Sequence, residues 1–202
     1  KYLNNYINIH VFYLHKVNPD DRINNAFNKS FEWDVDLFSG YDYTFMKNLS
    51  KNPNVNTFFG CDNPSIRFHL KKKRFDGVLI LGWYLKGFIQ ALIYSKLNGL
   101  PVYCRGDSRI KYDEGFIKAL VKRIVYPLFL NLFDKFFYVG KDNKYYLEFY
   151  GVTSQKLYFC PHFIDQNFFQ KRVKPNNKKS KKLEILFIGK LIERKNPFFL
   201  ID

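Results

Sequence analysis

The chain has 202 residues, enough for one large domain or two small ones, and 47% of them are hydrophobic, which provides for a sizeable core and argues against a disordered chain. Lysine and arginine together number 33 against 18 aspartate and glutamate residues, so the formal net charge is +15. Such a charge favours anionic partners, namely nucleotide phosphates, nucleic acid or an anionic membrane surface, and carries no information on the fold.

The N-terminal part of the chain predicts one strand followed by a long irregular stretch. The run "INIHVFYL", residues 7–14, is dense in β-branched and aromatic residues and predicts a buried strand. Residues 18–65 are polar and aromatic, with frequent Asn, Asp and Gly, and predict loops and one short helix. The run "KKKRFD", residues 71–76, is typical of a solvated basic segment before a strand, and a nucleic-acid patch is the alternative.

From residue 76 onward, short apolar runs alternate with helical patterns. Strands are expected at "DGVLIL", "PVYC", "KFFYVG" and "KLYFCP", which are residues 76–81, 101–104, 135–140 and 156–161. Helices are expected between them, at residues 84–99, 116–132 and 142–151, and Gly99 and Gly151 stand where a helix ends with glycine. Strands joined by connections of helix length predict a parallel sheet with right-handed crossovers.

The helix expected over residues 116–132 is amphipathic. Its apolar positions are 117, 120, 121, 124, 125, 128 and 132, and packing into the core accounts for them, with a kink expected before Pro127. Its basic residues Lys118, Lys122 and Arg123 raise a second possibility, which is contact with anionic lipid.

A basic segment separates this region from the end of the chain. Residues 171–182, "KRVKPNNKKSKK", are polar and without periodicity, which is typical of a linker. We therefore expect an α/β fold, with a doubly wound, Rossmann-like parallel-sheet domain at residues 1–170 and the start of a second domain at residues 183–202.

The cysteines and the absence of a long apolar run bear on location. Cys61, Cys104 and Cys160 are odd in number, far apart and without a C-x-x-C pair, which argues against a disulfide framework or a zinc site and fits a reducing compartment. Cys104 and Cys160 fall in strand-like runs, which predicts buried thiols. No stretch reaches the roughly 18 apolar residues of a spanning helix, and no signal peptide is visible. The chain starts with Lys, so its natural start is expected to lie elsewhere.

The segment "LFIGKLIERKNPFFLID", residues 186–202, combines the elements of an anion site. A strand is expected at residues 185–188, Gly189 permits a tight turn, and a helix is expected to start at Asn196 and Pro197. Free N–H groups and the dipole at a helix N-terminus attract anions, and Lys190 and Lys195 add positive charge there. A diphosphate held by the two lysines is one interpretation, and a solvated basic loop before an ordinary helix is the other.

Within that segment, "FIGKLIERKNP" resembles the opening of the C-terminal domain of GT-B glycosyltransferases of family 4. There a strand ends in Gly-Arg or Gly-Lys, a second Lys follows five residues later, and both basic side chains contact the diphosphate of the donor. The resemblance therefore implies that Gly189, Lys190 and Lys195 form the start of a nucleotide-sugar site.

Four further segments are similar to this family in the right order, and together they cover most of the chain. They are "FEWDVDLFSGYDY", "LGWYLKGFIQALIYSKLNGLPVYCRGDS", "YVGKDNKYYLEFYGV" and "YFCPHFIDQNFF", the last of which matches the end of the N-terminal domain at Pro161, Asp165 and Phe169, with His162 and Phe163 in place of Asn-Gly. The family's first strand with its Gly-rich loop would precede residue 1, and its Glu-x7-Glu motif would lie beyond residue 202. The chain thus resembles a glycosyltransferase truncated at both ends.

The resemblance implies a function. A retaining enzyme of this type transfers a sugar from a nucleotide-sugar to a glycan or lipid-linked acceptor, in cell-surface polysaccharide or glycolipid synthesis. The nucleotide-sugar is a substrate, and no metal or other cofactor is expected. The implied location is the cytoplasm, with peripheral contact at the inner face of the plasma membrane, and the isolated piece is expected to be inactive.

Candidate acceptor residues follow two of the expected strands. Arg105, Asp107 and Ser108 come directly after one strand, where Arg105 would bind phosphate or acceptor and Asp107 acceptor hydroxyls; an ordinary turn capped by Asp107 or Ser108 is the alternative. Trp83 follows another strand and either stacks on an acceptor sugar or packs, with packing favoured. Many family members carry a functional His near Trp83, and because this chain has none there, no catalytic base is assigned.

The remaining histidines give no further site. His162 is expected to have a structural rather than a catalytic role near the domain hinge. His10, His15 and His69 lack Cys, Asp or Glu partners at metal-ligand spacing, so no metal site is proposed.

Two other classes of protein compete with the glycosyltransferase. A basic α/β module that binds nucleic acid or an anionic membrane would also explain the net charge. A doubly wound dehydrogenase is the third hypothesis, although no G-x-G-x-x-G occurs in the chain and the Gly-Lys…Lys pair fits it less well.

Overall fold

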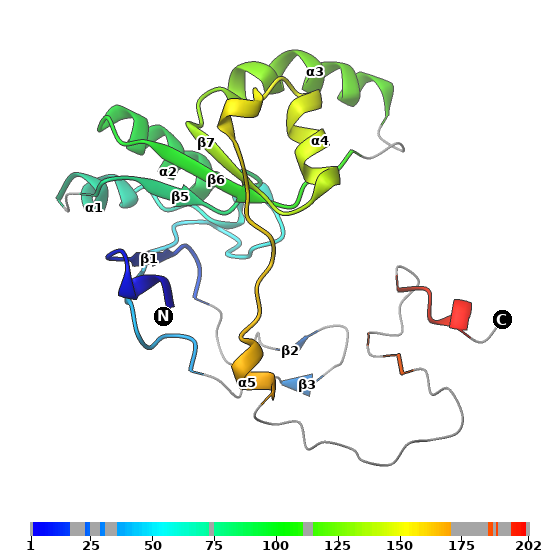
Figure 1. Cartoon of the computed structure of the whole chain (residues 1–202). Coiled ribbons are helices and arrows are strands. Elements are labelled where there is room, and N and C mark those ends of the chain that lie inside the picture. The colour runs from blue at the N-terminus through cyan, green and yellow to red at the C-terminus, as the bar shows by residue number, and fades with distance from the viewer. Residues whose placement is uncertain are drawn as a thin grey trace. The chain divides into compact units, whose positions relative to one another are not determined.

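The computed structural model describes residues 2–16, 23–24, 29–30, 36–72, 75–110, 115–170, 186–187, 189 and 195–200. The chain divides into two compact units, Lys1–His162 and Phe163–Asp202. The first unit contains the sheets and most of the helices (Figure 1). The division falls after His162, whereas the sequence placed the domain boundary after residue 170 and a linker at residues 171–182, which lie outside the described residues.

The main sheet consists of four parallel strands whose order in space is their order in the chain. They are β5 (Val78–Ile80), β6 (Val102–Gly106), β7 (Lys135–Tyr138) and β8 (Leu157–Phe159). The connecting helices are α2 (Lys86–Leu97), α3 (Phe116–Leu130) and α4 (Lys141–Phe149) (Figure 1). The predicted α/β fold with a parallel sheet is therefore confirmed, and this strand order is that of one half of a doubly wound sheet.

A second, two-stranded sheet precedes the main one. In it β1 (His10–Tyr13) pairs in parallel with β4 (Asp42–Phe45), with His10 opposite Asp42 and Tyr13 opposite Phe45. The strand predicted at residues 7–14 is confirmed at His10–Tyr13, but it is half-buried and not buried as expected. The prediction of loops and one short helix for residues 18–65 missed β4 and two shorter strands at Ile23–Asn24 and Lys29–Ser30. Tyr13 stacks on Phe45 with ring centres 5.1 Å apart, so cross-strand aromatic contacts stabilise this pair.

The remaining elements of the first unit are short. They are η1 (Tyr2–Asn5), the antiparallel pair β2 (Ile23–Asn24) and β3 (Lys29–Ser30), η3 (Phe58–Gly60), α1 (Ile66–Lys72) and η4 (Ser154–Lys156). The basic run predicted to be solvated before β5 therefore starts inside α1, whose last residues Lys71 and Lys72 are exposed.

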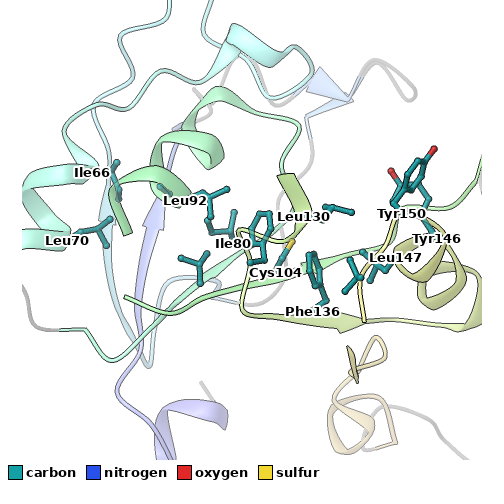
Figure 2. Close-up of a cluster of buried hydrophobic side chains, with 14 of the residues drawn as sticks. Ile66, Leu70, Ile80, Leu92, Cys104, Leu130, Phe136, Tyr146, Leu147 and Tyr150 are labelled. Carbon is teal, nitrogen blue, oxygen red and sulfur yellow. The ribbon is translucent and has the colours of Figure 1, made fainter. Parts of the chain in front are cut away.

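The hydrophobic core lies between one face of the main sheet and the helices. Ile80, Cys104 and Phe136 lie in one register row across β5, β6 and β7, and all three are buried. Leu92 of α2 and Leu130 of α3 belong to the same core cluster (Figure 2). Because chain-ordered parallel strands with right-handed crossovers place their helices on the same face, one layer of helices covers this side of the sheet.

The opposite face of the main sheet is also apolar but much less covered. It carries Leu79, Tyr103, Phe137 and Tyr158, which are half-buried or exposed. Phe137 contacts Tyr103 and Tyr158 at ring-centre distances of 6.1 Å and 6.3 Å. Strands buried on both faces are the rule in parallel α/β proteins, so this face differs from a fully doubly wound sheet.

Two glycines end helices as the sequence predicted. Gly99 after α2 and Gly151 after α4 have φ angles of 68° and 85°, in the left-handed region that favours glycine. After α2, the N–H of Gly99 donates to the carbonyl of Lys96, and the N–H of Leu100 donates to that of Ser95. These bonds satisfy carbonyl groups that the end of a helix leaves unpaired.

Helix α3 packs differently from the prediction. Ile117, Leu120, Val121, Ile124 and Leu128, which were predicted to face the core, are all exposed. The core side is instead formed by three other residues, Tyr126, Phe129 and Leu130, of which Leu130 is fully buried. The assignment was wrong because α3 is apolar around most of its circumference, and the face with the larger aromatic side chains packs.

The second unit contains two short helices among its described residues, α5 (Gln166–Gln170) and η6 (Pro197–Leu200). The strand predicted at residues 185–188 is not found at Leu186 and Phe187, which are irregular and exposed. A strand needs a neighbour for its backbone groups, and no described residue pairs with these two. Asn196 has a φ of 43° and precedes a 3₁₀ turn, so the predicted helix start is confirmed only as that short turn.

Candidate functional site

The carboxyl ends of β5 to β8 define one edge of the main sheet, because the four strands are parallel. In open α/β sheets, ligands bind outside this edge. The segments that leave it here are residues 81–83 after β5, residues 107–110 after β6, residues 139–140 after β7 and residues 160–162 after β8. Three of the four acceptor candidates from the sequence, Arg105, Asp107 and Ser108, lie at the end of β6.

Arg105 connects the end of β6 to the segment after β8. Its Nη2 atom donates to the carbonyl oxygen of Pro161 at 3.1 Å and lies 3.5 Å from that of Cys160. The same nitrogen is 3.3 Å from Nδ1 of His162. A guanidinium only donates, so Nδ1 accepts, and the proton of the neutral imidazole then sits on Nε2. The predicted structural role of His162 agrees with this contact.

The guanidinium of Arg105 retains unused hydrogen-bonding capacity. All three contacts involve Nη2, whereas Nε and Nη1 make no hydrogen bond within the described part of the chain. A guanidinium has five N–H groups in one plane and can bind two oxygens of a phosphate or carboxylate side by side. Arg105 can therefore stay anchored to the β8 segment and still present cationic N–H groups to an anionic ligand.

The loop after β6 is fixed from the other side by Asn143, which the sequence analysis did not single out. Asn143 is buried in the first turn of α4, and its Nδ2 donates to the carbonyl oxygen of Ser108 at 2.9 Å. Its Oδ1 accepts from the backbone N–H of Val139 at 3.3 Å. The sequence feature that could have pointed to Asn143 is its position as a polar residue just after the strand expected at residues 135–140. Asn143 thus holds the β6 and β7 loops together.

Asp107 and Ser108 differ in exposure. Asp107 is exposed, and its carboxylate makes no hydrogen bond or ion pair to another described residue. Ser108 is half-buried and is held through its carbonyl oxygen, as described above. The carboxylate of Asp107 is therefore available to accept hydrogen bonds from ligand hydroxyl groups.

Trp83 packs beneath α3. Its indole contacts the rings of Tyr126, Phe129 and Phe133 at centre distances of 6.4 Å, 6.3 Å and 6.3 Å. This arrangement corresponds to the packing interpretation of Trp83, and the ring anchors the segment that leaves β5.

The start of that segment depends on Gly82. Its φ of 99° lies in the left-handed region, so an L-residue would be strained there.

Burial raises the pKa of the Cys104 thiol to about 12, and a hydrogen bond from the Gly82 backbone offsets this only in part. Cys104 is therefore a structural thiol and not a nucleophile at neutral pH.

The other two cysteines are free as well, but they differ in access. Cys61 is fully buried, and burial raises its pKa. Cys160, predicted to be buried like Cys104, is only half-buried because it follows the end of β8 at the open edge of the sheet.

The candidate diphosphate residues lie in the second unit. Gly189 is at a bend, and a Cβ placed on it would lie 3.0 Å from the ring of Phe187. Lys195 is exposed just before Asn196, whereas Lys190 lies outside the described residues. The two lysines are therefore not brought together by the described structure, and the anion site stays a prediction from sequence.

No metal centre is found in the part of the chain that the structure describes, since no three His, Cys, Asp or Glu side chains gather there. None of the described helices has the length and apolar character needed to cross a membrane. Comparisons with protein-family models, curated proteins and solved structures find no match for this chain.

Proposed function

We propose that this chain is the acceptor-binding domain of a retaining GT-B glycosyltransferase together with the start of its donor domain. The complete protein would transfer a sugar from a nucleotide-sugar to a glycan or lipid-linked acceptor. The observation that carries the proposal is the loop after β6, which lies at the carboxyl edge of four parallel strands and is held on one side by Asn143 and on the other by the segment after β8.

In this proposal the loop after β6 binds the acceptor. The unused N–H groups of Arg105 bind a phosphate or a sugar oxygen, and the exposed carboxylate of Asp107 accepts hydrogen bonds from sugar hydroxyls. Because Arg105 is already anchored to Pro161 and His162, little side-chain entropy is lost when a ligand binds. A rigid loop of this kind suits precise placement of an acceptor.

The donor is bound by residues of the second unit. Lys190 and Lys195, after Gly189, hold the diphosphate of the nucleotide-sugar, as the resemblance to family 4 implies. When the bond between the sugar and the diphosphate breaks, negative charge grows on the departing diphosphate, and fixed cations stabilise it without a metal ion. The proposal assigns no catalytic base.

The arrangement of the two parallel sheets supports a Rossmann-like domain. Among the described residues, β1 pairs only with β4, and β5 pairs only with β6. In the order 3-2-1-4-5-6, strand 1 lies between strands 2 and 4. If β4 and β1 are strands 3 and 2 and β5 is strand 4, the first strand implied by the resemblance pairs with both β1 and β5.

The test uses the complete natural protein, expressed from the gene that encodes these residues, and a panel of nucleotide-sugars. We expect release of a nucleoside diphosphate with one donor, dependent on a glycan or lipid-linked acceptor. Lys190→Ala and Lys195→Ala should each lower kcat/KM by about 100-fold or more, as expected for loss of a group that stabilises developing charge. Lys71→Ala, which removes an exposed lysine of α1, should leave kcat/KM unchanged.

The opposite result has a clear meaning. If the complete protein neither binds nor turns over any nucleotide-sugar, the glycosyltransferase proposal is wrong. Nucleic-acid binding that weakens steeply with salt would then favour the basic binding module.

A further inference from the structure

The loop between β4 and α1 presents two neighbouring phenylalanine rings to solvent. Phe58 and Phe59, which we call the aromatic pair, lie in η3 and are 44% and 70% exposed. Their ring centres are 5.0 Å apart and their planes meet at 85°, so the edge of one ring contacts the face of the other. Apolar residues that are exposed singly are normal on protein surfaces, whereas two adjacent rings held in one fixed arrangement point to a contact.

The loop that carries the aromatic pair is held by its own hydrogen bonds. Oδ1 of Asn54 accepts from the backbone N–H groups of Asn56 and Thr57 at 2.9 Å each, and from the hydroxyl of Thr57 at 3.1 Å. The N–H of Asn54 donates to the carbonyl of Gly60 at 3.0 Å. A Cβ on Gly60 would lie 2.2 Å from the carbonyl oxygen of Asn54, so the loop closes tightly there. Because the loop is already ordered, little conformational entropy is lost when a ligand binds to it.

The base of the loop is attached to the carboxyl ends of both parallel sheets. Nδ2 of Asn63 donates to the carbonyl oxygens of Leu14 at 2.9 Å and Lys47 at 3.1 Å, which follow the ends of β1 and β4. Asp62 accepts from Nζ of Lys86 at 2.6 Å, at the start of α2 and therefore after the end of β5. The aromatic pair thus belongs to the same edge of the fold as the loop after β6, where ligands of α/β proteins bind.

Charge and area decide between the possible ligands of the aromatic pair. Residues 52–61 contain no Lys, Arg, Asp or Glu, although charged residues make up 25% of the chain. Nucleic acid and anionic lipid need cations at the contact. The exposed parts of the two rings together amount to roughly one ring, on the order of 200 Å², whereas a protein partner needs about 800 Å² on each side. A small uncharged ligand remains.

A neutral sugar has the matching chemistry. One face of a pyranose ring carries C–H groups, which pack on the electron-rich face of an aromatic ring, and its edge carries hydroxyl groups that need polar partners. The side-chain amide of Asn56 is exposed and makes no hydrogen bond to another residue that the structure describes, so it can both donate to and accept from hydroxyls.

We propose that the aromatic pair binds a neutral sugar unit of the acceptor, with the ring of Phe59 stacked on the C–H face of the sugar and the amide of Asn56 at its hydroxyls. This rests on the proposed function, because the sugar is part of the acceptor glycan. The stacked sugar lies apart from the acceptor group bound at Arg105 and Asp107, so the aromatic pair contributes to the choice of acceptor and not to the transfer step.

The first experiment needs no nucleotide-sugar. The 202-residue chain is mixed with the methyl glycosides of glucose, galactose, mannose and N-acetylglucosamine, and binding is followed by saturation-transfer difference NMR. We expect at least one glycoside to bind, with the strongest saturation on the C–H protons of one face of its ring.

Substitutions at Phe59 separate stacking from general apolar contact. Phe59→Ala and Phe59→Leu should both weaken binding by about tenfold or more, because the planar ring is lost, while Phe59→Trp should stay within about threefold of the wild type. Phe68→Ala is the matched control, since Phe68 is 60% exposed on α1, outside the loop, and should change binding by less than about twofold.

The thiol of Cys61 reports whether the loop is intact in each variant. Its Sγ donates to the carbonyl oxygen of Asn54 at 3.3 Å and is buried, so it should stay protected from Ellman's reagent. Asn56→Ala keeps both rings and covers the case in which Phe59→Ala disturbs the loop. It should weaken sugar binding by about threefold to tenfold through the lost amide.

The outcomes distinguish this proposal from the glycosyltransferase proposal. The sugar site is overturned if none of the four glycosides binds to the wild type, if Phe59→Leu binds as well as the wild type, or if Phe68→Ala weakens binding as much as Phe59→Ala. In the complete protein, transfer with an acceptor KM that Phe59→Ala leaves unchanged would overturn the sugar site alone. Sugar binding at the aromatic pair without turnover of any nucleotide-sugar would overturn the glycosyltransferase proposal and leave a sugar-binding protein.

Discussion

At the residue scale, the reactivity of the three cysteine thiols reports which parts of the chain are accessible to solvent. Cys61 and Cys104 are fully buried and have raised pKa values, whereas Cys160 is half-buried. At pH 8 we expect one thiol to react quickly with Ellman's reagent and two to react only after unfolding, because the thiolate is the reactive form. Cys160→Ser should remove the fast reaction, and a fast reaction that persists in this variant would contradict the structure.

Asp62 provides a pH-dependent contribution to stability. Its carboxylate accepts hydrogen bonds from Nζ of Lys86 at 2.6 Å and from Nε2 of Gln90 at 2.7 Å. The bond from Lys86 is the main cause that lowers the pKa of Asp62, with Gln90 adding to it and burial opposing it. A carboxyl whose pKa is lowered by folding stabilises the folded state above its unfolded pKa, and this stabilisation is lost as the pH falls through the folded pKa.

We therefore expect Asp62→Asn to reduce the free energy of unfolding by about 1 kcal/mol at pH 7, since the pair is partly exposed to water. The difference from the wild type should shrink as the pH falls below about 4, near the unfolded pKa of aspartate. Urea unfolding at several pH values measures this. Asp76→Asn, at an exposed position before β5, serves as the control, and an equal effect of both substitutions would refute the role of the Lys86 bond.

At the scale of elements, two neighbouring residues of β5 lie on opposite faces of the main sheet. Ile80 is 3% exposed and belongs to the core, whereas Leu79 is 51% exposed on the opposite face. Ile80→Ala should lower the free energy of unfolding by about 3 kcal/mol through lost burial and a cavity, and Leu79→Ala by less than about 1 kcal/mol. Similar losses at both positions in urea unfolding would mean that a layer covers the outer face.

The elements also show which inferences from sequence succeed. Apolar spacing located α3 but not its buried side, because two faces of the helix are apolar and only tertiary contacts choose between them. The segment of β4 was read as a loop, since Asp42–Phe45 becomes a strand by pairing with β1, about 30 residues earlier, and short-range patterns do not report such pairing. Gly99 and Gly151 were predicted correctly because their conformations are a local property.

The candidate site shows the same difference between local patterns, which the sequence reveals, and long-range contacts, which it does not. The sequence placed Arg105 at the end of a strand, and therefore at the carboxyl edge of the sheet, because that depends only on the local strand pattern. It did not give the contact between Arg105 and Pro161, which are 56 residues apart, or the bond that Asn143 makes to Ser108. These contacts arise from the pairing of β6, β7 and β8, which brings the loops together.

At the scale of the whole molecule, the proposed strand between β1 and β5 leads to a prediction. A chain extended to its natural start should have a higher free energy of unfolding than residues 1–202 alone, because the strand adds backbone hydrogen bonds to two edges and covers apolar surface. It should also bind less of the dye anilinonaphthalene sulfonate. Both quantities are measured on the two chains, with an extension of equal length and unrelated polar sequence as the control. No difference from that control would remove the support for the Rossmann-like order.

The chain order of β5, β6, β7 and β8 has a consequence for biosynthesis. Each strand pairs with the strand that precedes it in the chain, so the next strand can join the sheet without a partner from a later part of the chain. On the ribosome, every new helix and strand can dock on a finished edge as it emerges, because neighbouring strands are separated in sequence only by one helix and its loops. The sheet can therefore grow in one direction during translation, and the loop after β6 receives its anchors from Asn143 and Pro161 in the order in which they are synthesised.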